Sequence, residues 1–454
     1  MSKTILLAAL AAATTLGAQA QDIVGDWQGA LKIGEAELHL VVHIAKVDNG
    51  GLKATMDSPD QGATGIPISS ISLKDSKLIF TSDAVHGTYE GTLNAAGTEI
   101  QGTWTQRAPL PLVLKRGAAT IAAPPRRPQN PVKPYPYREE DLTYENRQTG
   151  IKLAATLTVP QGKGPFPAVA LITGSGAQDR DESLLGHKPF LVLADYLTRK
   201  GIAVLRTDDR GTAKSGGVFA TATTADFATD TEAAIAYLKT RPEVYPKRIG
   251  LIGHSEGGVI APMVAARNRD VAFIVMMAGT AVPGDEIIVA QVVANAEASG
   301  ISQTVAAEAG VKQRRILNIV KQEKDEAVRR QKLRAELGAA VTDAQFEAAY
   351  KAFDSPWYRY TLTYDPGPAL RQVTCPVLAI NGEKDVQVPA RLNLPVIRKA
   401  LEAGGNKRSE VVELPGLNHL FQNAKTGAVS EYGQIEETMS PVALEKMASW
   451  ILTQ

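Results

Sequence analysis

The sequence is poor in cysteine, in net charge and in long apolar runs, and each shortage excludes a class of protein. Cys375 is the only cysteine among 454 residues, so the chain forms no internal disulfide and no cysteine-rich zinc or iron–sulfur site. Its 49 basic and 48 acidic residues leave a formal net charge of +1, which gives no reason to expect nucleic acid or an anionic membrane as a partner. The 44% hydrophobic content is that of a folded globular protein.

The first twenty residues have the pattern of a secretory signal peptide. Lys3 provides the positive charge, residues 5–16 the apolar segment, and Ala18-Gln19-Ala20 the small-residue cleavage site. The apolar segment is too short for a comfortable membrane span, and no later stretch approaches the roughly 18 apolar residues that a span needs. Gln21 rather than cysteine follows the cut, which argues against a lipoprotein anchor. We therefore expect an exported protein, periplasmic or secreted, without a membrane span in its mature form.

Residues 21–116 have the pattern of a small all-β domain. Turn-forming segments separate short β-prone runs at 38–44, 77–81, 87–93, 99–105 and 112–114. This spacing predicts a small antiparallel barrel or sandwich. Gly25-Asp26-Trp27 and Gly102-Thr103-Trp104 resemble the Gly-x-Trp signatures of lipocalin-like barrels. We interpret the two tryptophans as core residues rather than as a ligand site.

A proline-rich linker is predicted at 117–138, where six of the chain's 26 prolines lie within thirteen positions and favour an extended spacer. From about residue 139 to 454, apolar strands alternate with amphipathic helices, which predicts an α/β fold with a mainly parallel sheet. The expected strands are 168–172, 202–205, 249–252, 271–277 and 377–380, and the expected helices are 190–199, 227–240 and 259–267. A helical lid is predicted at about 285–355.

The predicted lid has an excess of positive charge. Residues 311–334 contain nine basic and three acidic side chains, a local net charge of +6. Two interpretations follow. The charges either form a solvated helix face or make a basic lid that favours anionic substrates.

The clearest chemical motif is Gly253-His254-Ser255-Glu256-Gly257, which fits G-x-S-x-G. It follows the apolar run 249–252 and precedes a helical stretch, which is the strand–turn–helix context of a nucleophile elbow. A serine on so tight a turn adopts strained backbone angles, and side chains two residues to either side would collide with the strand or the helix. The pattern predicts Ser255 as a nucleophile.

A serine nucleophile needs a general base and a carboxylate that orients it, in the chain order Ser, acid, His. Among six histidines only His419 follows Ser255, in a loop after the β-prone run 410–414, so we predict it as the base. The acid should follow the strand 377–380. Asp385 is the preferred candidate there, with Glu383 as the alternative.

An oxyanion hole combines the amide after the nucleophile with one from the loop after an earlier strand. Glu256 provides the first amide. The second is expected from Ser175 or Gly176 in Thr173-Gly174-Ser175-Gly176, and the sequence does not choose between them. We interpret Asp208-Asp209-Arg210 as a buried ion pair or turn that shapes the pocket wall. Two roles, in the pocket or in the core, are open for the aromatic residues Trp357, Tyr358 and Tyr360.

These motifs give residues 139–454 a resemblance to the α/β-hydrolases. The stretches 173–182, 208–211, 253–258 and 381–385 resemble exported bacterial carboxylesterases related to the serine aminopeptidase-like hydrolases. The resemblance implies a parallel sheet flanked by helices, a cap between strands, no metal or cofactor, and hydrolysis of short to medium acyl esters. This chain has Thr173-Gly174 where many relatives have His-Gly, so the resemblance does not carry the oxyanion residue over.

The sequence therefore predicts a serine hydrolase with a small-molecule ester as substrate. A peptidase or aminopeptidase acting on short peptides or amides is the nearest alternative. In that case carboxylates of the cap would hold the substrate amine, and Glu297, Glu308 and Asp354 are available. A third possibility is an envelope- or carbohydrate-binding protein in which the β domain is the functional part and the hydrolase domain is vestigial.

Overall fold

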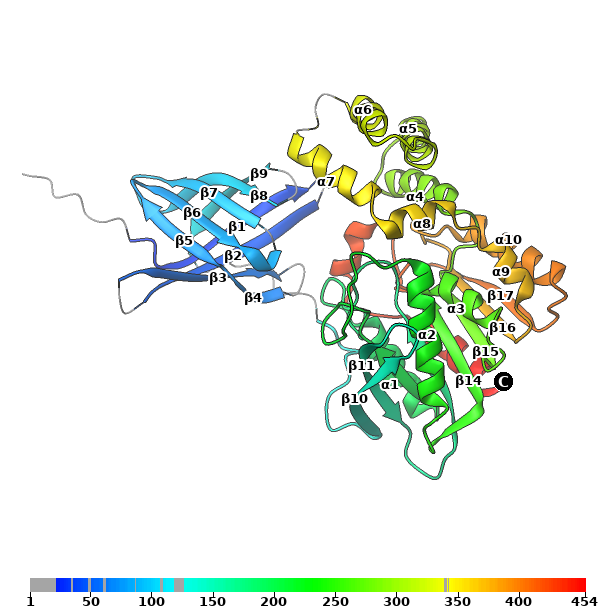
Figure 1. The fold of residues 1–454 in the computed structure, drawn as a ribbon. Helices are drawn as coiled ribbons and strands as arrows, with labels where there is room; N and C mark the ends of the chain where they lie inside the picture. The colour runs from blue at the N-terminus through cyan, green and yellow to red at the C-terminus, as the bar shows by residue number, and fades with distance from the viewer. Residues whose placement is uncertain are drawn as a thin grey trace, which may run out of the picture. The chain divides into compact units, whose positions relative to one another are not determined.

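The computed structural model describes residues 22–33, 36–47, 50–59, 63–85, 87–106, 109–117, 126–338, 341 and 343–454. Residues 1–20 of the predicted signal peptide, Gln21 and residues 118–125 of the predicted linker lie outside this set. The described residues form two compact units, one up to residue 117 and the other from residue 126 to the end of the chain. Figure 1 colours both by position in the sequence. Within the described residues, no helix has the length and apolar character that crossing a membrane requires.

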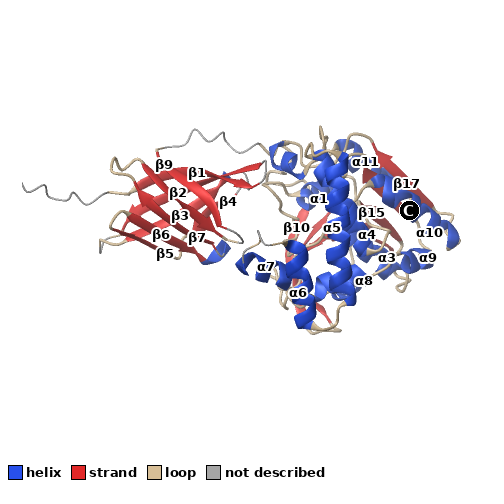
Figure 2. Cartoon of the chain, turned by 90° about the horizontal axis from the view of Figure 1, so that it is seen from above, coloured by secondary structure: helices blue, strands red, loops and turns tan. Residues whose placement is uncertain are grey.

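The described part of the first unit is a nine-stranded antiparallel sheet (Figure 2). Its strands are β1 (Gly25–Ile33), β2 (Ala36–Lys46), β3 (Leu52–Ser58), β4 (Ala63–Pro67), β5 (Ser70–Lys74), β6 (Lys77–Ser82), β7 (Gly87–Leu93), β8 (Glu99–Thr105) and β9 (Pro109–Arg116). They pair in the order β4-β3-β2-β1-β9-β8-β7-β6-β5. Ile68 and Ser69, between the edge strands β4 and β5, donate to carbonyls of β3 and β6. The two edges therefore approach each other, and the sheet curls toward a barrel.

The concave side of this sheet is filled by side chains. Trp27 and Trp104 are buried there together with Phe80 and Tyr89, and the Phe80 and Tyr89 rings stack at 5.0 Å between centroids. The Tyr89 hydroxyl lies 3.0 Å from the carbonyl oxygen of Ile100, to which it donates. The interpretation of the two tryptophans as core residues is confirmed.

The second unit is built on an eight-stranded sheet. Its strands are β10 (Arg138–Asn146), β11 (Ile151–Val159), β12 (Phe166–Ile172), β13 (Ala203–Thr207), β14 (Val244–His254), β15 (Phe273–Met277), β16 (Val377–Gly382) and β17 (Ser409–Leu414). The order is β10-β11-β13-β12-β14-β15-β16-β17. The pairs β10–β11 and β11–β13 are antiparallel, and the remaining pairs are parallel. The mainly parallel sheet confirms the α/β class and agrees with the α/β-hydrolase resemblance.

Helices cover both faces of this sheet. Alternate residues of the strands point to opposite sides, so both faces carry apolar side chains that must be buried. The helices are α1 (Pro189–Arg199), α2 (Thr224–Leu238), α3 (Gly257–Ala265), α9 (Gly367–Gln372), α10 (Ala390–Ala403) and α11 (Pro441–Leu452). One core lies between the sheet and α2, α3, α9 and α10, and the other between the sheet and α1 and α11. In β12, for example, Ala168 and Ala170 belong to the first core, whereas Val169 and Leu171 belong to the second.

A helical insertion, Gly284–Thr363, separates β15 from β16 in the sequence (Figure 1). It consists of α4 (Gly284–Ala298), α5 (Gln303–Gln322), α6 (Glu326–Leu337), α7 (Asp343–Phe353) and α8 (Pro356–Thr363). Its own core includes Ile316, Val320, Leu333 and Leu362. Periodic apolar residues of this segment therefore pack on one another.

The basic side chains of the insertion are mostly neutralised by neighbours. Six of the nine basic residues in 311–334 form ion pairs, namely Arg315 with Glu336, Lys321 with Asp285, Arg329 with Asp354, Arg330 with Glu347, Lys332 with Glu323, and Arg334 with Asp343. Most of these partners lie outside the segment whose net charge is +6. The structure therefore favours a paired helix surface over a basic lid that attracts anionic substrates.

The second half of the predicted linker is held against the second unit. Arg127 donates to the carbonyl oxygens of Ile435 at 2.9 Å and Gly433 at 2.7 Å. Gln129 accepts hydrogen bonds from the amides of Thr438 at 2.6 Å and Met439 at 3.0 Å. This N-terminal strap, residues 126–130, binds the segment that contains the short helix η3 (Val429–Gln434).

Candidate active site

Ser255 lies in the turn between β14 and α3 and has a positive φ of 53°. This conformation is strained for a residue with a side chain. Glycines make the turn possible. A Cβ atom on Gly253 would lie 1.9 Å from the carbonyl oxygen of Gly257, and one on Gly257 would lie 2.2 Å from that of Ile172. The Ser255 amide, 2.8 Å from the Met277 carbonyl oxygen, fixes the turn to β15. The backbone is that of a nucleophile elbow.

His419 and Asp385 are in direct contact. The Nδ1 atom of His419 donates to Oδ2 of Asp385 at 2.8 Å, and both side chains are buried. The other carboxylate oxygen of Asp385 accepts hydrogen bonds from the amides of Gln387 at 2.9 Å and Val388 at 2.8 Å. Glu383, the alternative acid, accepts a hydrogen bond from the Gly416 amide instead. The geometry therefore favours Asp385 over Glu383 as the partner of His419.

Among the described residues, Ser255 and His419 form no direct hydrogen bond, and His419 contacts the residue next to Ser255. The ring of His254, one residue before Ser255, lies 4.8 Å from the ring of His419. In hydrolases without substrate this catalytic hydrogen bond is often long and tightens only when substrate binds.

The loop after β12 packs against Ser255. A Cβ atom on Gly174 would lie 3.4 Å from Cβ of Ser255. The Gly174 amide donates to Oε1 of Glu182 at 2.7 Å, so it is already engaged. Ser175, the next residue, lines the cavity that contains Ser255, whereas Gly176 is not among the residues that line it. Of the two amides left open by the sequence, the geometry favours that of Ser175.

Asp208-Asp209-Arg210 fixes the surroundings of this loop. The carboxylate of Asp208 forms an ion pair with Arg180, and Arg210 pairs with Asp230. Asp209 accepts hydrogen bonds from the Thr173 hydroxyl at 2.6 Å and the Gln178 amide at 2.9 Å. The ion pairs bear out the predicted buried ion pair, but none of the three residues is among the described residues that line the cavity beside Ser255. Thr173, which stands where many relatives have histidine, is a tether that joins the loop to Asp209.

Burial dominates the electrostatics next to the nucleophile. It raises the pKa of Asp209 to about 7, and the carboxylates of Glu256 and Glu182 act in the same direction. Burial also raises the pKa of Glu256, although hydrogen bonds from Thr224 and Trp357 oppose this effect. Two carboxyl groups with raised pKa values therefore lie near the predicted oxyanion amides: Asp209, which binds the loop after β12, and Glu256 itself.

A cavity of about 140 Å³ opens next to Ser255. Its apolar wall includes Val282 from the loop after β15, Ile287 from α4 and Val388 from the loop after β16. Trp357 of α8 also lines it, and its indole nitrogen donates to Oε1 of Glu256 at 2.8 Å.

The other candidates from the insertion lie elsewhere. Tyr358 packs in the core of the insertion and Tyr360 against the core of the sheet. Glu297, Glu308 and Asp354, the carboxylates considered for an aminopeptidase, are not among the described residues that line the cavity. Asp354 instead pairs with Arg329 and Arg359.

Two residues near the nucleophile were missed by the sequence analysis. The chain order Ser, acid, His excludes His254 as the base because it precedes Ser255, and no sequence motif assigns a role to Glu182. The structure buries both and joins them by a hydrogen bond of 2.9 Å. The sequence does contain one indication: His254 lies inside the G-x-S-x-G motif, directly before Ser255, so its side chain must lie near the end of the sheet.

Comparison with known protein families shows to which family the chain belongs. The sequence model of the X-Pro dipeptidyl-peptidase (S15) family matches residues 149–394, which is more than half of the chain. The chain belongs to the S15 family. The S15 match includes Ser255 and Asp385 and ends before His419.

Individual relatives carry esterase names. The chain is 26% identical to the esterase EstD of Thermotoga maritima over 325 residues, covering 71% of this chain and 69% of that protein. Among solved structures, Est1E of Butyrivibrio proteoclasticus with bound ferulic acid is 19% identical, with a TM-score of 0.43, covering 69% of this chain and 98% of that one. The Pyrococcus furiosus esterase Pf2001 is 15% identical, with a TM-score of 0.42, covering 74% and 97%.

Proposed function

We propose that the second unit is a serine hydrolase that cleaves carboxylic esters of short to medium acyl chains. The observation that carries the proposal is the buried His419–Asp385 pair beside a strained serine at the end of β14. The similarity to EstD, named as an esterase, supports the same reaction.

In the proposed mechanism, His419 takes the proton of the Ser255 hydroxyl, and Oγ attacks the ester carbonyl. The amides of Glu256 and Ser175 stabilise the oxyanion. His419 then gives its proton to the leaving alcohol, and the acyl group stays on Ser255 as an ester. Water, activated by the same histidine, attacks this acyl-enzyme and releases the carboxylic acid. Asp385 stabilises the imidazolium and keeps the ring oriented with Nε2 toward Ser255.

The cavity supports short acyl groups. An apolar protein cavity of about 150 Å³ holds a molecule the size of benzene, and the cavity beside Ser255 measures about 140 Å³. We infer that acyl chains of up to about six carbons fit in this cavity. The helical insertion would act as a lid, because α4 and α8 supply part of the cavity wall.

A peptidase acting on short peptides or amides is the second candidate. The S15 family match favours it, since the family description is that of an X-Pro dipeptidyl-peptidase. The absence of Glu297, Glu308 and Asp354 from the cavity lining removes the cap carboxylates considered for binding an amine. Ester hydrolysis is therefore the first proposal.

The test is turnover of matched substrates by the mature protein. Nitrophenyl esters of increasing acyl length and the nitroanilides of the same acids are compared in the wild type and in Ser255→Ala. In the wild type, we expect ester turnover to be highest for short acyl groups and anilide turnover to be slower. In Ser255→Ala, we expect ester turnover to be at least 100-fold lower than in the wild type. Anilide turnover exceeding ester turnover would establish the peptidase instead, and an active Ser255→Ala variant would rule out both.

We further propose that the protein is exported, on the basis of residues 1–20. In this proposal the first unit is a lipocalin-like barrel that serves as a docking or targeting module rather than as part of the hydrolase. Its tightly filled core agrees with a role for its outer surface.

A further inference from the structure

A second carboxylate–histidine pair lies behind the nucleophile. Oε1 of Glu182 accepts the Gly174 amide at 2.7 Å and lies 2.9 Å from Nδ1 of His254. Nε2 of His254 lies 3.0 Å from the carbonyl oxygen of His419. Both side chains are more than nine-tenths buried. One continuous chain of hydrogen bonds therefore joins the loop after β12 to the loop that carries His419 through His254, the residue that directly precedes Ser255.

Counting protons shows that this pair shares one buried proton. The carbonyl oxygen of His419 only accepts, so Nε2 of His254 must carry a hydrogen. Nδ1 faces a carboxylate oxygen, so a further proton lies between Nδ1 and Oε1. An imidazolium donating to a carboxylate satisfies both contacts. Burial lowers the pKa of His254, but Glu182 and the His419 carbonyl outweigh it, and the net shift is upward.

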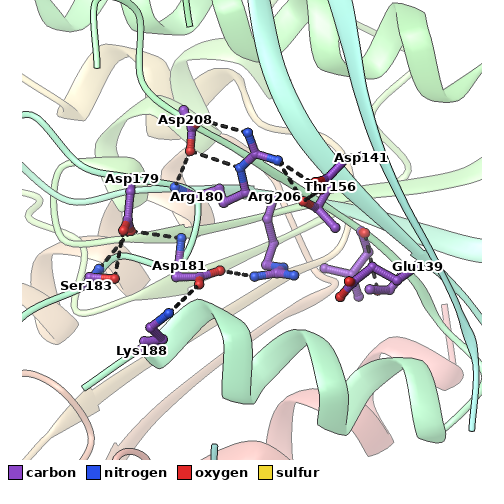
Figure 3. Close-up of polar contacts among 12 residues, drawn as sticks. Glu139, Asp141, Thr156, Asp179, Arg180, Asp181, Ser183, Lys188, Arg206 and Asp208 are labelled. Atoms are coloured by element: carbon purple, nitrogen blue, oxygen red, sulfur yellow. Dashed lines mark hydrogen bonds and ion pairs between the residues drawn. The ribbon is translucent and has the colours of Figure 1, made fainter. Parts of the chain in front are cut away.

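The turn that carries Glu182 is held rigidly in place (Figure 3). Arg180 makes two side-chain hydrogen bonds to Asp208, at 3.0 Å and 2.7 Å, and its amide donates to the same carboxylate at 2.9 Å. Asp179 accepts the amides of Asp181 and Ser183, both at 3.0 Å. Glu182 itself has a positive φ of 53°. This framework fixes the backbone of the turn from which Glu182 reaches Gly174 and His254.

We propose that Glu182 and His254 are positioning residues for the proposed reaction: they hold Gly174 so that the next amide, that of Ser175, faces the oxyanion, and they hold the backbone of His419 beside Ser255. The inference rests on the proposed function. Neither residue is among the described residues that line the cavity beside Ser255. Their contribution belongs to the transition state, because the Ser175 amide binds the oxyanion more strongly than the ground-state carbonyl.

Three variants separate this role from a purely structural one. Glu182→Gln keeps an oxygen for the Gly174 amide but removes the charge that holds the imidazolium. His254→Gln places an amide nitrogen near the Nε2 position and keeps the contact with the His419 carbonyl, but loses Glu182. The double variant completes the cycle. Glu243→Gln is the control, because Glu243 is also a largely buried, ion-paired carboxylate but precedes β14, at the opposite end of the strand from His254.

The readout is the rate at which a fluorophosphonate labels Ser255 in the full-length mature protein, measured by intact mass. The dependence of the rate on probe concentration yields the maximal rate and the half-saturating concentration separately. We expect each single variant to lose about 100-fold in maximal rate, the size of one misplaced oxyanion donor, with half-saturation within about 3-fold of wild type. We expect the double variant to be no more than about 3-fold below the slower single variant, since both act as one unit. Glu243→Gln should match the wild type.

Maximal rates equal to wild type, losses confined to half-saturation, or multiplicative losses in the double variant would each overturn the inference while leaving the proposed function intact. A wild type that does not label on Ser255 would instead overturn the proposed function, and the positioning role with it. If Glu182→Gln does not accumulate as folded protein, His254→Asn tests the same contact, because its amide nitrogen lies near the Nδ1 position. It should stay within about 10-fold of wild type, and a loss equal to that of His254→Gln would contradict the role of Glu182.

Discussion

At the residue scale, the central question is which carboxylate supports His419. Asp385 lies 2.8 Å from Nδ1 of the histidine and has both oxygens satisfied by donors. Glu383, two residues earlier, bonds to the Gly416 amide. The two carboxylates are close in sequence and differ in their contacts, so they form a matched pair for mutation.

Asp385→Asn should reduce kcat for ester hydrolysis by about 10⁴-fold, because the amide would stabilise the wrong tautomer of His419. KM should change little, since Asp385 does not contact substrate. Glu383→Gln should stay within about 3-fold of wild type in both constants. Steady-state kinetics on a short-chain ester measures both. A larger loss in Glu383→Gln than in Asp385→Asn would show that the acid has been misassigned.

Asp209 provides a prediction for the pH dependence of stability. Burial raises its pKa from 3.8 to about 7. Between about pH 4 and 7 the folded protein therefore binds a proton that the unfolded chain has released, and stability falls as pH rises through this window. Asp209→Asn lacks this titration. Relative to Asp209→Asn, the wild type should melt at a progressively lower temperature as the pH rises from 4.5 to 7.5. The corresponding loss in unfolding free energy is on the order of a few kcal/mol. A constant difference across this range would contradict the buried, protonated state.

At the element scale, helix α8 is joined to the nucleophile elbow by one hydrogen bond. Trp357 of α8 and Thr224 at the start of α2 both donate to Oε1 of Glu256, at 2.8 Å and 2.7 Å. The insertion and the elbow therefore share a buried carboxyl group, and the wall of the cavity depends on this contact.

Trp357→Phe should remove one donor from Glu256 and lower the stability by about 1–3 kcal/mol, the cost of leaving a buried polar group short of a partner. KM for short-chain esters should rise several-fold, because the ring lines the cavity, while kcat is largely kept. Tyr358→Phe on the same helix is the control, since its ring packs in the core of the insertion, and it should leave KM unchanged. Thermal melts and kinetics measure the two effects. Equal KM values for both variants would mean that Trp357 does not shape the acyl pocket.

The sequence predicted the elements of the second unit better than those of the first. Continuous apolar runs buried on both faces revealed β12, β14 and β16, and the glycines around Ser255 revealed the elbow. Strands β1, β3, β4 and β5 were not among the predicted β-prone runs. β4 and β5 are short edge strands with mostly exposed side chains and little apolar patterning. Glu182 and His254 could not be paired in advance, since 72 positions separate them in the sequence and only the tertiary fold brings them together.

At the scale of the whole molecule, the two units have separate cores, and the strap 126–130 belongs to the second. Arg127 and Gln129 bind backbone groups between Gly433 and Met439. In that segment, Tyr432 accepts a hydrogen bond from the Gln387 side chain, two residues beyond Asp385. The strap therefore supports the side of the site that holds the acid.

A shortened chain should function if it keeps the strap. We expect residues 126–454 to hydrolyse short esters within about 2-fold of the full mature protein, because the first unit contributes no residue to the proposed mechanism. Full-length Arg127→Ala/Gln129→Ala should melt at a lower temperature and lose activity. The two substitutions remove six hydrogen bonds between these side chains and backbone groups beyond the strap, and the backbone partners are left unpaired. Activity lost in 126–454 but kept in the double variant would show that the first unit takes part in catalysis.

The central claim is that turnover passes through an acyl group on Ser255. The most direct measurement mixes the mature protein with excess short-chain ester, quenches with acid within a fraction of a turnover, and locates the added mass by peptide mapping. We predict one acyl group on the peptide that contains Ser255, present in the wild type, absent in Ser255→Ala and greatly reduced in His419→Ala. Ester turnover without an acyl adduct on Ser255, or with the adduct on another residue, would contradict the proposed mechanism.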